Sequence, residues 1–361
     1  MAEQNHSAGY TARDIQVLEG MEAVRRRPGM YIGSTDSRGL HHLVYEIVDN
    51  AVDEAMAGYC TNVTVLIQTN GAVQVEDDGR GIPVDIHPAT GKSAVETVMT
   101  TLHSGAKFGG KSYTGSGGLH GVGASVVNAL SSWLRVEVRR DGYLYAQEFQ
   151  RGHATGPLKR VGDATGSGTR TTFIPDQEIF GPPEYDFDTL CQRFKEMAYL
   201  NKGLRISVIS EWHREQGYAE WKHEYLFDGG IASFVTDLNR SKEVLQPNPI
   251  YVHKAVDDTT VEAAFQYNSG SSETPYSFAN CINTVDGGTH LTGFRTALTR
   301  AFNDYARRQK FLKDDQPNFS GEDVREGLTA VLSVKLMNPQ FEGQTKGKLG
   351  NPEVKGYVDS V

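Results

Sequence analysis

Residues 46–55 read Glu-Ile-Val-Asp-Asn-Ala-Val-Asp-Glu-Ala, within a segment of helical periodicity at 40–58. On a helical wheel, at about 100° per residue, three further polar residues fall within about 80° of Glu46, namely Asn50, Asp53 and Glu54. The opposite side collects Val44, Ile47, Val48, Ala51 and Ala55. One face of the predicted helix therefore packs, and the other presents three acids and an amide, which are oxygen ligands suited to Mg²⁺. The alternative is an ordinary solvated helix face.

Two strands are predicted downstream of this helix, at 63–69 and 72–77, joined by the hairpin signal Asn70-Gly71. The second strand ends in a turn, and residues 75–83 read Val-Glu-Asp-Asp-Gly-Arg-Gly-Ile-Pro. A carboxylate only accepts hydrogen bonds, so Asp77 is suited to receive one from an adenine amino group. Gly79 and Gly81 let the backbone approach a flat ring closely. The alternative is an ordinary Asp-Gly turn.

A dense glycine run precedes a second predicted helix. Residues 116–123 read Ser-Gly-Gly-Leu-His-Gly-Val-Gly and lead directly into helical sequence at 124–130. Backbone N–H groups at a helix N-terminus bind anions, and glycines let several of them converge on phosphate oxygens. A flexible linker is the alternative, although a helix of small residues follows at once. The stretch 105–112 matches the P-loop pattern, but helical sequence precedes it where a buried strand is required, so the match is interpreted as accidental.

The composition is typical of a soluble globular protein with room for two domains. Of the 361 residues, 38% are hydrophobic and 22% charged. No apolar run approaches the roughly 20 residues of a membrane span, and residues 1–10 lack the apolar core of a signal peptide. Cys60, Cys191 and Cys281 lie far apart, which indicates neither a disulfide framework nor a zinc site and is typical of the cytoplasm. Because the net charge is −9, contact with DNA requires a local basic surface.

The second half of the chain also alternates strands and helices. Antiparallel strands are predicted over 133–175 and a helix near 188–201, and Asp228-Gly229-Gly230 is interpreted as the start of a second domain. In that domain, strands near 262–268 and 277–284 precede a long helix at 289–309 and a strand at 329–335. A last helix begins near Pro352 and runs to the end of the chain, so we expect a cut fragment.

Taken together, these motifs resemble those of the GHKL ATPases, which include Hsp90 chaperones, MutL repair proteins, histidine kinases and type II topoisomerases. The set comprises Glu46-x-x-x-Asn50, Asp77-x-Gly79-x-Gly81, the glycine run 117–123 and Gly168-Thr169. Other segments are similar to the ATPase subunits of the bacterial DNA gyrase and topoisomerase IV group: Arg27-Pro-Gly-Met-Tyr-Ile-Gly33, Asp286-Gly-Gly-Thr-His290 and Gln344-Thr345-Lys346. The resemblance covers essentially the whole chain.

The resemblance implies an α+β protein of two domains. Residues 1–225 would form a GHKL (Bergerat) ATPase domain, a two-layer α/β sandwich with a mostly antiparallel sheet, including an N-terminal arm used in dimerisation. Residues 226–361 would form a transducer domain similar to ribosomal protein S5 domain 2, truncated at its C-terminus. Full-length members continue into a metal-binding DNA-cleavage module, so this chain alone is not expected to break DNA.

The resemblance also implies a site for ATP and Mg²⁺. Glu46 would be the general base, supported by His42, and Asn50 would hold the metal. Gln344 and Lys346 would reach the γ-phosphate as further catalytic residues. The other nucleotide-binding residues would be Tyr10, Glu54, Asp77, Arg80, Gly81, Ile82, Pro83, Lys107, Tyr113, Gly118, Leu119, His120, Gly121, Val122, Gly123 and Thr169. Tyr10 would cross to the nucleotide of a partner protomer, and Arg80 and Arg140 would line a pocket for aminocoumarin inhibitors.

The implied function is the ATP-driven closing of a dimeric clamp on DNA. The chain would form a homodimer on binding ATP and assemble with a second, DNA-wrapping protein into a heterotetramer with two copies of each. Negative supercoiling is the outcome expected in gyrase, and decatenation the outcome in topoisomerase IV. A non-hydrolysing ATP sensor is a further alternative, but it has no use for a base at Glu46. The loop Gln344-Thr345-Lys346 disfavours a kinase or a chaperone.

Basic residues on the long predicted helix and just beyond it are candidates for DNA contact. They are Arg295, Arg307, Arg308 and Lys310. An ordinary solvated helix surface explains them equally well.

Overall fold

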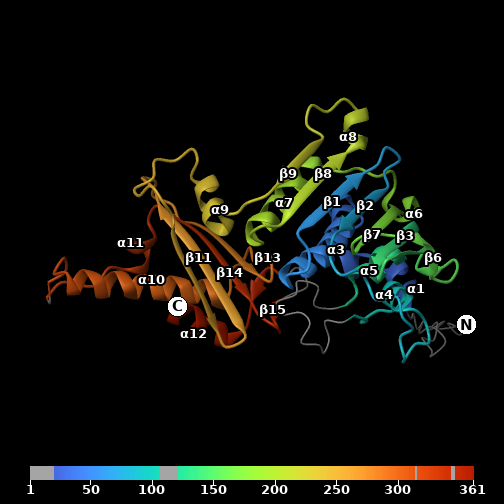
Figure 1. Ribbon diagram of the computed structural model, residues 1–361. Helices are drawn as coiled ribbons and strands as arrows, with labels where there is room; N and C mark the ends of the chain where they lie inside the picture. The colour runs from blue at the N-terminus through green and yellow to red at the C-terminus, as the bar shows by residue number, and fades with distance from the viewer. Residues whose placement is uncertain (1–19, 106–120, 314, 343–345) are drawn as a thin grey trace, which may run out of the picture.

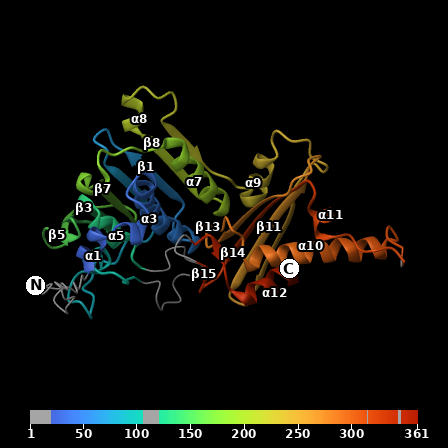
Figure 2. The same ribbon diagram turned by 180° about the vertical axis from the view of Figure 1, so that it is seen from behind.

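The computed structural model describes residues 20–105, 121–313, 315–342 and 346–361 (Figure 1). Two units, each built on its own sheet, lie side by side in an elongated molecule (Figures 1 and 2). Across these ranges, every helix is either too short or too polar to serve as a membrane span. The three cysteines are free and buried.

The first unit is a mixed α/β sandwich. Its sheet has the strand order β5-β4-β3-β7-β2-β1-β8-β9, and β6 pairs with β4. All pairs are antiparallel except β1 with β8, as expected for a mostly antiparallel sheet. The strands are β1 (Asn62–Ile67), β2 (Val73–Asp77), β3 (Ser131–Arg140), β4 (Tyr143–Gln150), β5 (His153–Ala154), β6 (Lys159–Asp163), β7 (Gly168–Pro175), β8 (Arg205–Ser210) and β9 (Lys222–Tyr225). The helices are α1 (Gly20–Arg26), α2 (Gly29–Ile32), α3 (Ser37–Met56), α4 (Ala94–Thr100), α5 (Gly123–Ala129), α6 (Gln177–Phe180), α7 (Phe187–Leu200) and α8 (Glu211–Glu215).

The helix α3 packs its apolar side against this sheet, as its periodicity predicts. It begins after an N-cap, Asp36, whose carboxylate accepts a hydrogen bond from Arg38 N at 3.0 Å. The periodicity placed Asp53 on the polar face that presents the acids, but this residue is only 1% exposed. The second unit packs near this end of α3, where Cys281 Sγ lies 3.5 Å from Met56 Sδ.

The second unit consists of a sheet covered by helices. Its strand order is β10-β11-β14-β12-β13, with β12 parallel to β14 and the other pairs antiparallel. The strands are β10 (Ile250–Val256), β11 (Thr259–Tyr267), β12 (Thr274–Ala279), β13 (Ile282–Asn283) and β14 (Leu328–Lys335), and β15 (Phe341–Glu342) pairs separately with β16 (Lys348–Leu349). The helices are α9 (Gly230–Leu238), α10 (Thr289–Arg308), α11 (Gly321–Arg325) and α12 (Pro352–Ser360).

The strand β10 was not predicted from the sequence. It is an edge strand with both faces largely exposed, so its sequence lacks the alternation that marks a half-buried strand. By contrast, β11, β14 and α10 form close to their predicted positions, whereas the strand predicted at 277–284 is divided in the structure between the end of β12 and β13.

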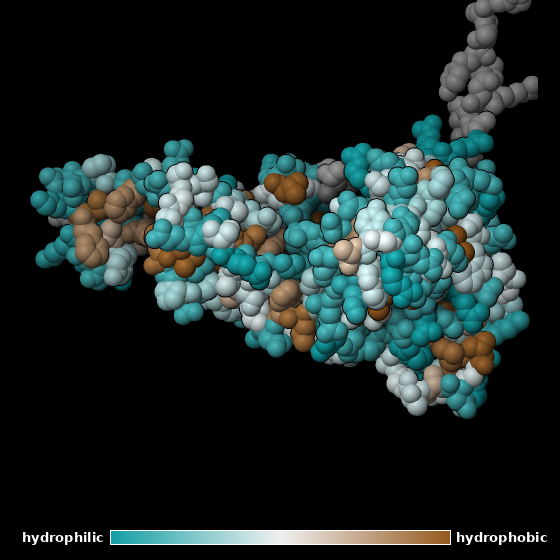
Figure 3. All heavy atoms as spheres, turned by 90° about the horizontal axis from the view of Figure 1, so that it is seen from above, coloured by the Kyte–Doolittle hydropathy of each residue, from teal (hydrophilic) through white to brown (hydrophobic). Residues whose placement is uncertain are grey.

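The helix α9 joins the two units. Its Phe234 stacks on Tyr199 of α7 with ring centroids 4.7 Å apart, and it lies 6.3 Å from the ring of Phe278 in β12. A division of the chain at residues 225 and 226 stays a prediction, since α9 packs on both sides of it. At the far end of α10, exposed aromatic side chains lie at Phe302, Tyr305, Phe311 and Phe319, where Figure 3 shows apolar surface.

Candidate functional site

Four of the predicted site residues lie on one side of α3, namely His42, Glu46, Asn50 and Glu54. Glu46, Asn50 and Glu54 are each one helical turn apart. His42, a turn before Glu46, places its Nε2 2.9 Å from Glu46 Oε1. This contact orients the carboxylate and leaves its second oxygen, Oε2, to face the start of α5.

The first residue of α5 is Gly123, and it lies directly against the Glu46 carboxylate. A Cβ on Gly123 would lie 2.1 Å from Glu46 Oε2, so any side chain there would displace the Glu46 carboxylate. Val122 is the N-cap of α5, and the preceding Gly121 accepts a hydrogen bond from Ser104 N at 3.1 Å. The predicted residues Gly121, Val122 and Gly123 therefore adjoin the predicted base, and the glycine at 123 lets the Glu46 carboxylate keep its position.

The end of β2 forms a second corner of the site. Asp77 Oδ1 accepts hydrogen bonds from Gly79 N at 2.9 Å and from Thr169 N at 3.3 Å. Thr169 Oγ1 accepts a third bond from Ile82 N at 3.3 Å, which ties the loop at 79–83 to β7. Among the described residues, none donates a recorded hydrogen bond to Asp77 Oδ2. Burial raises the pKa of Asp77 to about 6, because the charged form is desolvated.

Arginine side chains shape the loop after β2. Arg80 forms an ion pair with Glu54 at 2.8 Å, and its guanidinium lies 3.9 Å from the centre of the Tyr59 ring. Arg140 donates a hydrogen bond to Gly81 O at 2.8 Å. Glu54 and Arg80, both predicted to bind nucleotide, therefore also bind each other, and Ile82 and Pro83 follow on the same loop.

The second unit brings a cation to this site. Lys346 has a positive φ of 55°, a left-handed conformation that favours glycine. The next residue is anchored, since Gly347 O accepts a hydrogen bond from Asp286 N at 2.9 Å. Burial raises the pKa of Asp49 in α3 to about 6, and the positive charges of Arg193 and Lys346 oppose that rise. Lys346 is therefore within electrostatic range of α3.

Asp49, which the sequence prediction did not include, lies within electrostatic range of Glu46 and Lys346. A signal was available, because the i+3 spacing puts Asp49 about 60° from Glu46 on the helical wheel. Several other predicted residues lie outside the described ranges: Tyr10, Lys107, Tyr113, Gly118, Leu119, His120 and Gln344.

The side chains around Glu46 suit a Mg²⁺ ion that is held mainly by the phosphates of a bound nucleotide. Within the described ranges, no group of three His, Cys, Asp or Glu side chains is arranged to hold a metal. Mg²⁺ commonly keeps several waters and takes one or two protein ligands together with substrate phosphates. The exposed side chain of Asn50, next to Glu46 on α3, fits that mode of binding.

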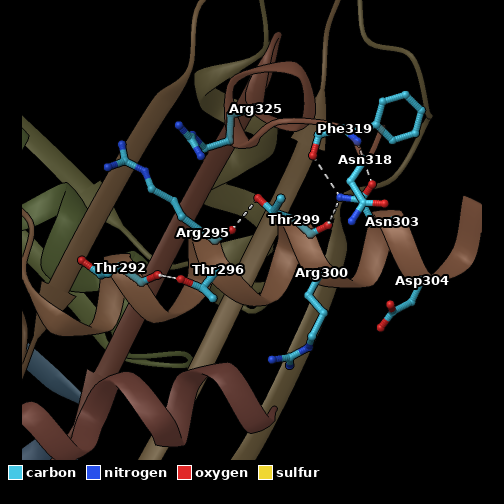
Figure 4. A pocket seen from close by; sticks show the side chains of 10 residues that line it. All are labelled: Thr292, Arg295, Thr296, Thr299, Arg300, Asn303, Asp304, Asn318, Phe319 and Arg325. Carbon is cyan, nitrogen blue, oxygen red and sulfur yellow. Dashed lines mark hydrogen bonds between the residues drawn. The ribbon is translucent and has the colours of Figure 1, made fainter. Parts of the chain in front are cut away.

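A separate pocket of about 650 Å³ lies along α10 in the second unit (Figure 4). Its cations are paired within the chain. Arg295 and Arg325 both bond to Glu273, at 2.9 and 3.2 Å, and Arg300 bonds to Asp359 at 2.6 Å. A contact of Arg295 with DNA, one of two readings of its sequence, would therefore require it to exchange a carboxylate partner for a phosphate.

Two family models match the chain. The model described as histidine kinase-, DNA gyrase B- and HSP90-like ATPase matches residues 35–179, which include α3, β2 and α5. The model described as DNA gyrase B matches residues 230–361, from α9 to the end of the chain.

Individual relatives match over nearly the whole chain. The B subunit of DNA gyrase from Clostridium acetobutylicum is 56% identical over 100% of this chain and 56% of its own length, and that from Streptococcus pneumoniae is 57% identical over 96% and 53%. The chain thus spans about half the length of these curated relatives.

Solved structures extend the comparison to the fold. The 43K ATPase domain of Thermus thermophilus gyrase B, solved in complex with an aminocoumarin, matches with a TM-score of 0.82 at 45% identity, covering 94% of this chain and 87% of that one. The topoisomerase IV ATP-binding domain of Francisella tularensis, in complex with a small-molecule inhibitor, matches with a TM-score of 0.78 at 32% identity, covering 95% and 90%. Since both units and nearly every residue take part in these matches, the chain belongs to the DNA gyrase B family.

Proposed function

We propose that the chain binds and hydrolyses ATP, and that hydrolysis drives a dimer clamp in a bacterial type II DNA topoisomerase, as the B subunit of DNA gyrase. The observation that carries the proposal is the placement of Glu46. Its carboxylate is held by His42 and lies against the start of α5, where Gly123 makes room for it. A mere nucleotide sensor has no need of a carboxylate held in this way.

The nucleotide would bind between the two corners of the site. Asp77 Oδ2 would accept a hydrogen bond from the adenine amino group, while Oδ1 stays bonded to Gly79 and Thr169. Backbone amides at the start of α5 would bind phosphate oxygens, which pairs anionic groups with N–H donors. Asn50 would ligate Mg²⁺, which supplies charge neutralisation on the phosphate chain when bound.

In hydrolysis, Glu46 would act on water. Oε1 bonds to His42, so Oε2 is the atom that would take the proton from the attacking water. Lys346 and Gln344 would bind the γ-phosphate from the second unit, and the Lys346 ammonium would stabilise the charge on the transferred group. Because this contact ends when the γ-phosphate leaves, the loop would also report hydrolysis to the second unit.

The remaining parts of the proposal concern the whole assembly in the cytoplasm. Binding of ATP would produce a homodimer, with Tyr10 crossing to the partner. The A subunit of gyrase would complete an A₂B₂ heterotetramer that introduces negative supercoils into DNA. Aminocoumarins would bind beside Arg80 and Arg140, since the similar Thermus thermophilus domain was solved with such a compound. The relatives at 56% and 57% identity are both B subunits of DNA gyrase, which favours gyrase over topoisomerase IV.

The test is Glu46→Ala in the 361-residue chain. Removing a general base should lower kcat for ATP hydrolysis by about 10²–10⁴-fold, while ADP affinity stays within about twofold of the parent. Glu178→Ala is the matched control, since Glu178 is a carboxylate of α6 exposed to solvent. A Glu46→Ala rate near the parent rate contradicts the proposal, and a parent chain that binds ATP without releasing phosphate establishes the sensor alternative.

A further inference from the structure

The outer face of the first sheet carries a set of paired charges behind the nucleotide site. Residues alternate along β3, so Arg140 points to the side of Gly81 and Arg139 to the opposite face. On that face Arg139 borders a pocket of about 450 Å³ together with Glu137 and Arg170. No nucleotide-binding role was predicted for Arg139 from its sequence context.

Arg139 crosses a neighbouring strand to reach the end of β2. In the β3–β7 ladder its partner is Gly168, which has no side chain to block the path. Its Nη2 donates a hydrogen bond to the backbone carbonyl of Asp77 at 3.1 Å, and its Nη1 bonds to Glu76. A Cβ on Gly168, whose φ is +143°, would lie 2.7 Å from Arg139 Nη2 and 2.1 Å from Asp77 O.

This contact replaces a missing hydrogen bond of the sheet. The β2–β7 ladder ends at the pair Glu76 and Arg170, so Asp77 lies one residue beyond it. At that point the guanidinium of Arg139 holds the Asp77 carbonyl from the outer face. Thr169 follows Gly168 in β7, and its N–H bonds to Asp77 Oδ1 on the inner face.

A second arginine braces the same corner. Glu76 also accepts a hydrogen bond from Arg170 Nε at 2.9 Å, and Arg170 Nη1 lies 3.6 Å from Glu137 Oε2. Burial raises the pKa of Glu76, but its bonds to Arg139 and Arg170 outweigh burial and bring that pKa below its usual value. Glu76 is therefore a stable anionic anchor for both arginines near neutral pH.

We propose that Arg139 is a positioning residue for adenine recognition, holding the backbone of Asp77 and the Gly168-Thr169 segment so that Asp77 Oδ2 faces the ligand. The inference rests on the proposed function, because it assumes that Asp77 reads the adenine amino group. Arg139 itself touches no nucleotide in this scheme, since it lies on the face of the sheet opposite the site. Its side chain lines the pocket on the outer face, so its replacement enlarges that pocket and not the core.

The experiment compares two ligands that differ only in the amino group that Asp77 would read. Calorimetric titration measures the affinity of the chain for ADP and for purine riboside diphosphate, which lacks the 6-amino group. The variants are Arg139→Gln and Arg139→Lys. The matched control is Arg135→Gln, because Arg135 lies on the same face of β3 and bonds to Glu148 at 2.8 Å and to Glu137 at 3.4 Å, and not to Glu76 or Asp77.

Arg139→Gln should weaken ADP binding by about five- to tenfold, because the charged hydrogen bond from Arg139 to the backbone carbonyl of Asp77 is lost. Purine riboside diphosphate should lose less than about twofold, so the preference for the amino group shrinks. Arg139→Lys should regain part of that preference, because an ammonium can still bond to the Asp77 carbonyl, and Arg135→Gln should match the parent.

Equal losses for both ligands, or no loss for either, overturn the proposal, since a merely structural arginine has no reason to discriminate between them. If Arg139→Gln does not fold, Glu76→Gln replaces it, because that change removes the anchor and leaves the arginine in place. A parent chain that binds neither ligand refutes the proposed function itself, and this outcome is visible before any variant is made.

Discussion

Replacing Asp77 by asparagine isolates one atom of the site. Both recorded hydrogen bonds to the carboxylate go to Oδ1, from Gly79 N and Thr169 N. An asparagine oxygen at that place keeps them, so the corner holds its shape. The change puts an NH₂ group where Oδ2 stood. That group would meet the adenine amino group donor to donor, with no acceptor between them.

The loss of binding follows from the bond that disappears. A hydrogen bond to a charged group contributes about 1.5–3 kcal/mol, which corresponds to a factor of about 10–150 in affinity. We expect Asp77→Asn to weaken ATP and ADP binding within that range. Inhibitors that mimic adenine should weaken in parallel, because they use the same acceptor.

The same substitution should stabilise the unliganded chain above pH 6. Burial raises the pKa of Asp77 from its ordinary value of 3.8 to about 6. Between these values the folded state binds more protons than the unfolded state. The free energy of unfolding is therefore not reduced by Asp77 below pH 3.8, and it falls as the pH rises through 6. At about 1.4 kcal/mol per tenfold change in proton affinity, the ionised carboxylate costs the fold up to about 3 kcal/mol at pH 7.5. Asp77→Asn has no such cost.

Two measurements test this reasoning together. Calorimetric titration with ADP at pH 7.5 reports the affinity, and thermal unfolding without nucleotide at pH 5 and pH 7.5 reports stability. The variant should bind more weakly and unfold at a higher temperature, with a larger gain at pH 7.5 than at pH 5. An affinity within about threefold of the parent would refute the role of Oδ2. A stability difference that is the same at both pH values would refute the buried-charge argument.

Three further predictions concern catalysis, packing and assembly. Lys346→Ala should slow ATP hydrolysis by about 10²–10³-fold with little change in ADP affinity, because ADP lacks the γ-phosphate that Lys346 would bind; equal losses in rate and ADP affinity would exclude that contact. Gly123→Ala should reduce hydrolysis to near background, since its Cβ would lie 2.1 Å from Glu46 Oε2, whereas Gly156→Ala, with nothing within 4 Å, should keep the parent rate. Light scattering should report a monomer without nucleotide and a dimer with a non-hydrolysable ATP analogue, because a ligand shifts assembly only by binding the closed form better; one mass under both conditions contradicts the clamp.

Much of the site was predictable from the sequence, because the positions of its residues on a helix or at a turn depend on residues close by in the chain. The period of α3 placed Glu46, Asn50 and Glu54 on one side, and packing of the opposite side against the sheet follows from the same period. The signal Asn70-Gly71 predicted the antiparallel pairing of β1 with β2, which is observed. Local periodicity and turn preferences act over a few residues, so sequence alone carries them.

The structure corrects that local interpretation where another part of the chain intervenes. Asp53 belongs to the polar side of α3 by periodicity, yet it is only 1% exposed in the folded chain. The strand β10 lacks a regular pattern, yet it forms because β11 offers a ladder of hydrogen bonds. The partner of β10 is the next strand along the chain, but an isolated two-stranded hairpin is marginal at best, and β14 and β12 from farther along complete the sheet that holds it.

The sequence by itself determined which side chains carry chemistry and which face of each element they occupy. The tertiary structure decided which of them meet. Thr169 bonds to Asp77 from 92 residues away, and Arg139 reaches Asp77 only because β7 lies between β3 and β2 with a glycine at the crossing point. Alternation along a strand sets the face of each residue but leaves the order of strands open. That order follows from how the whole apolar surface is buried, which is a property of the complete chain.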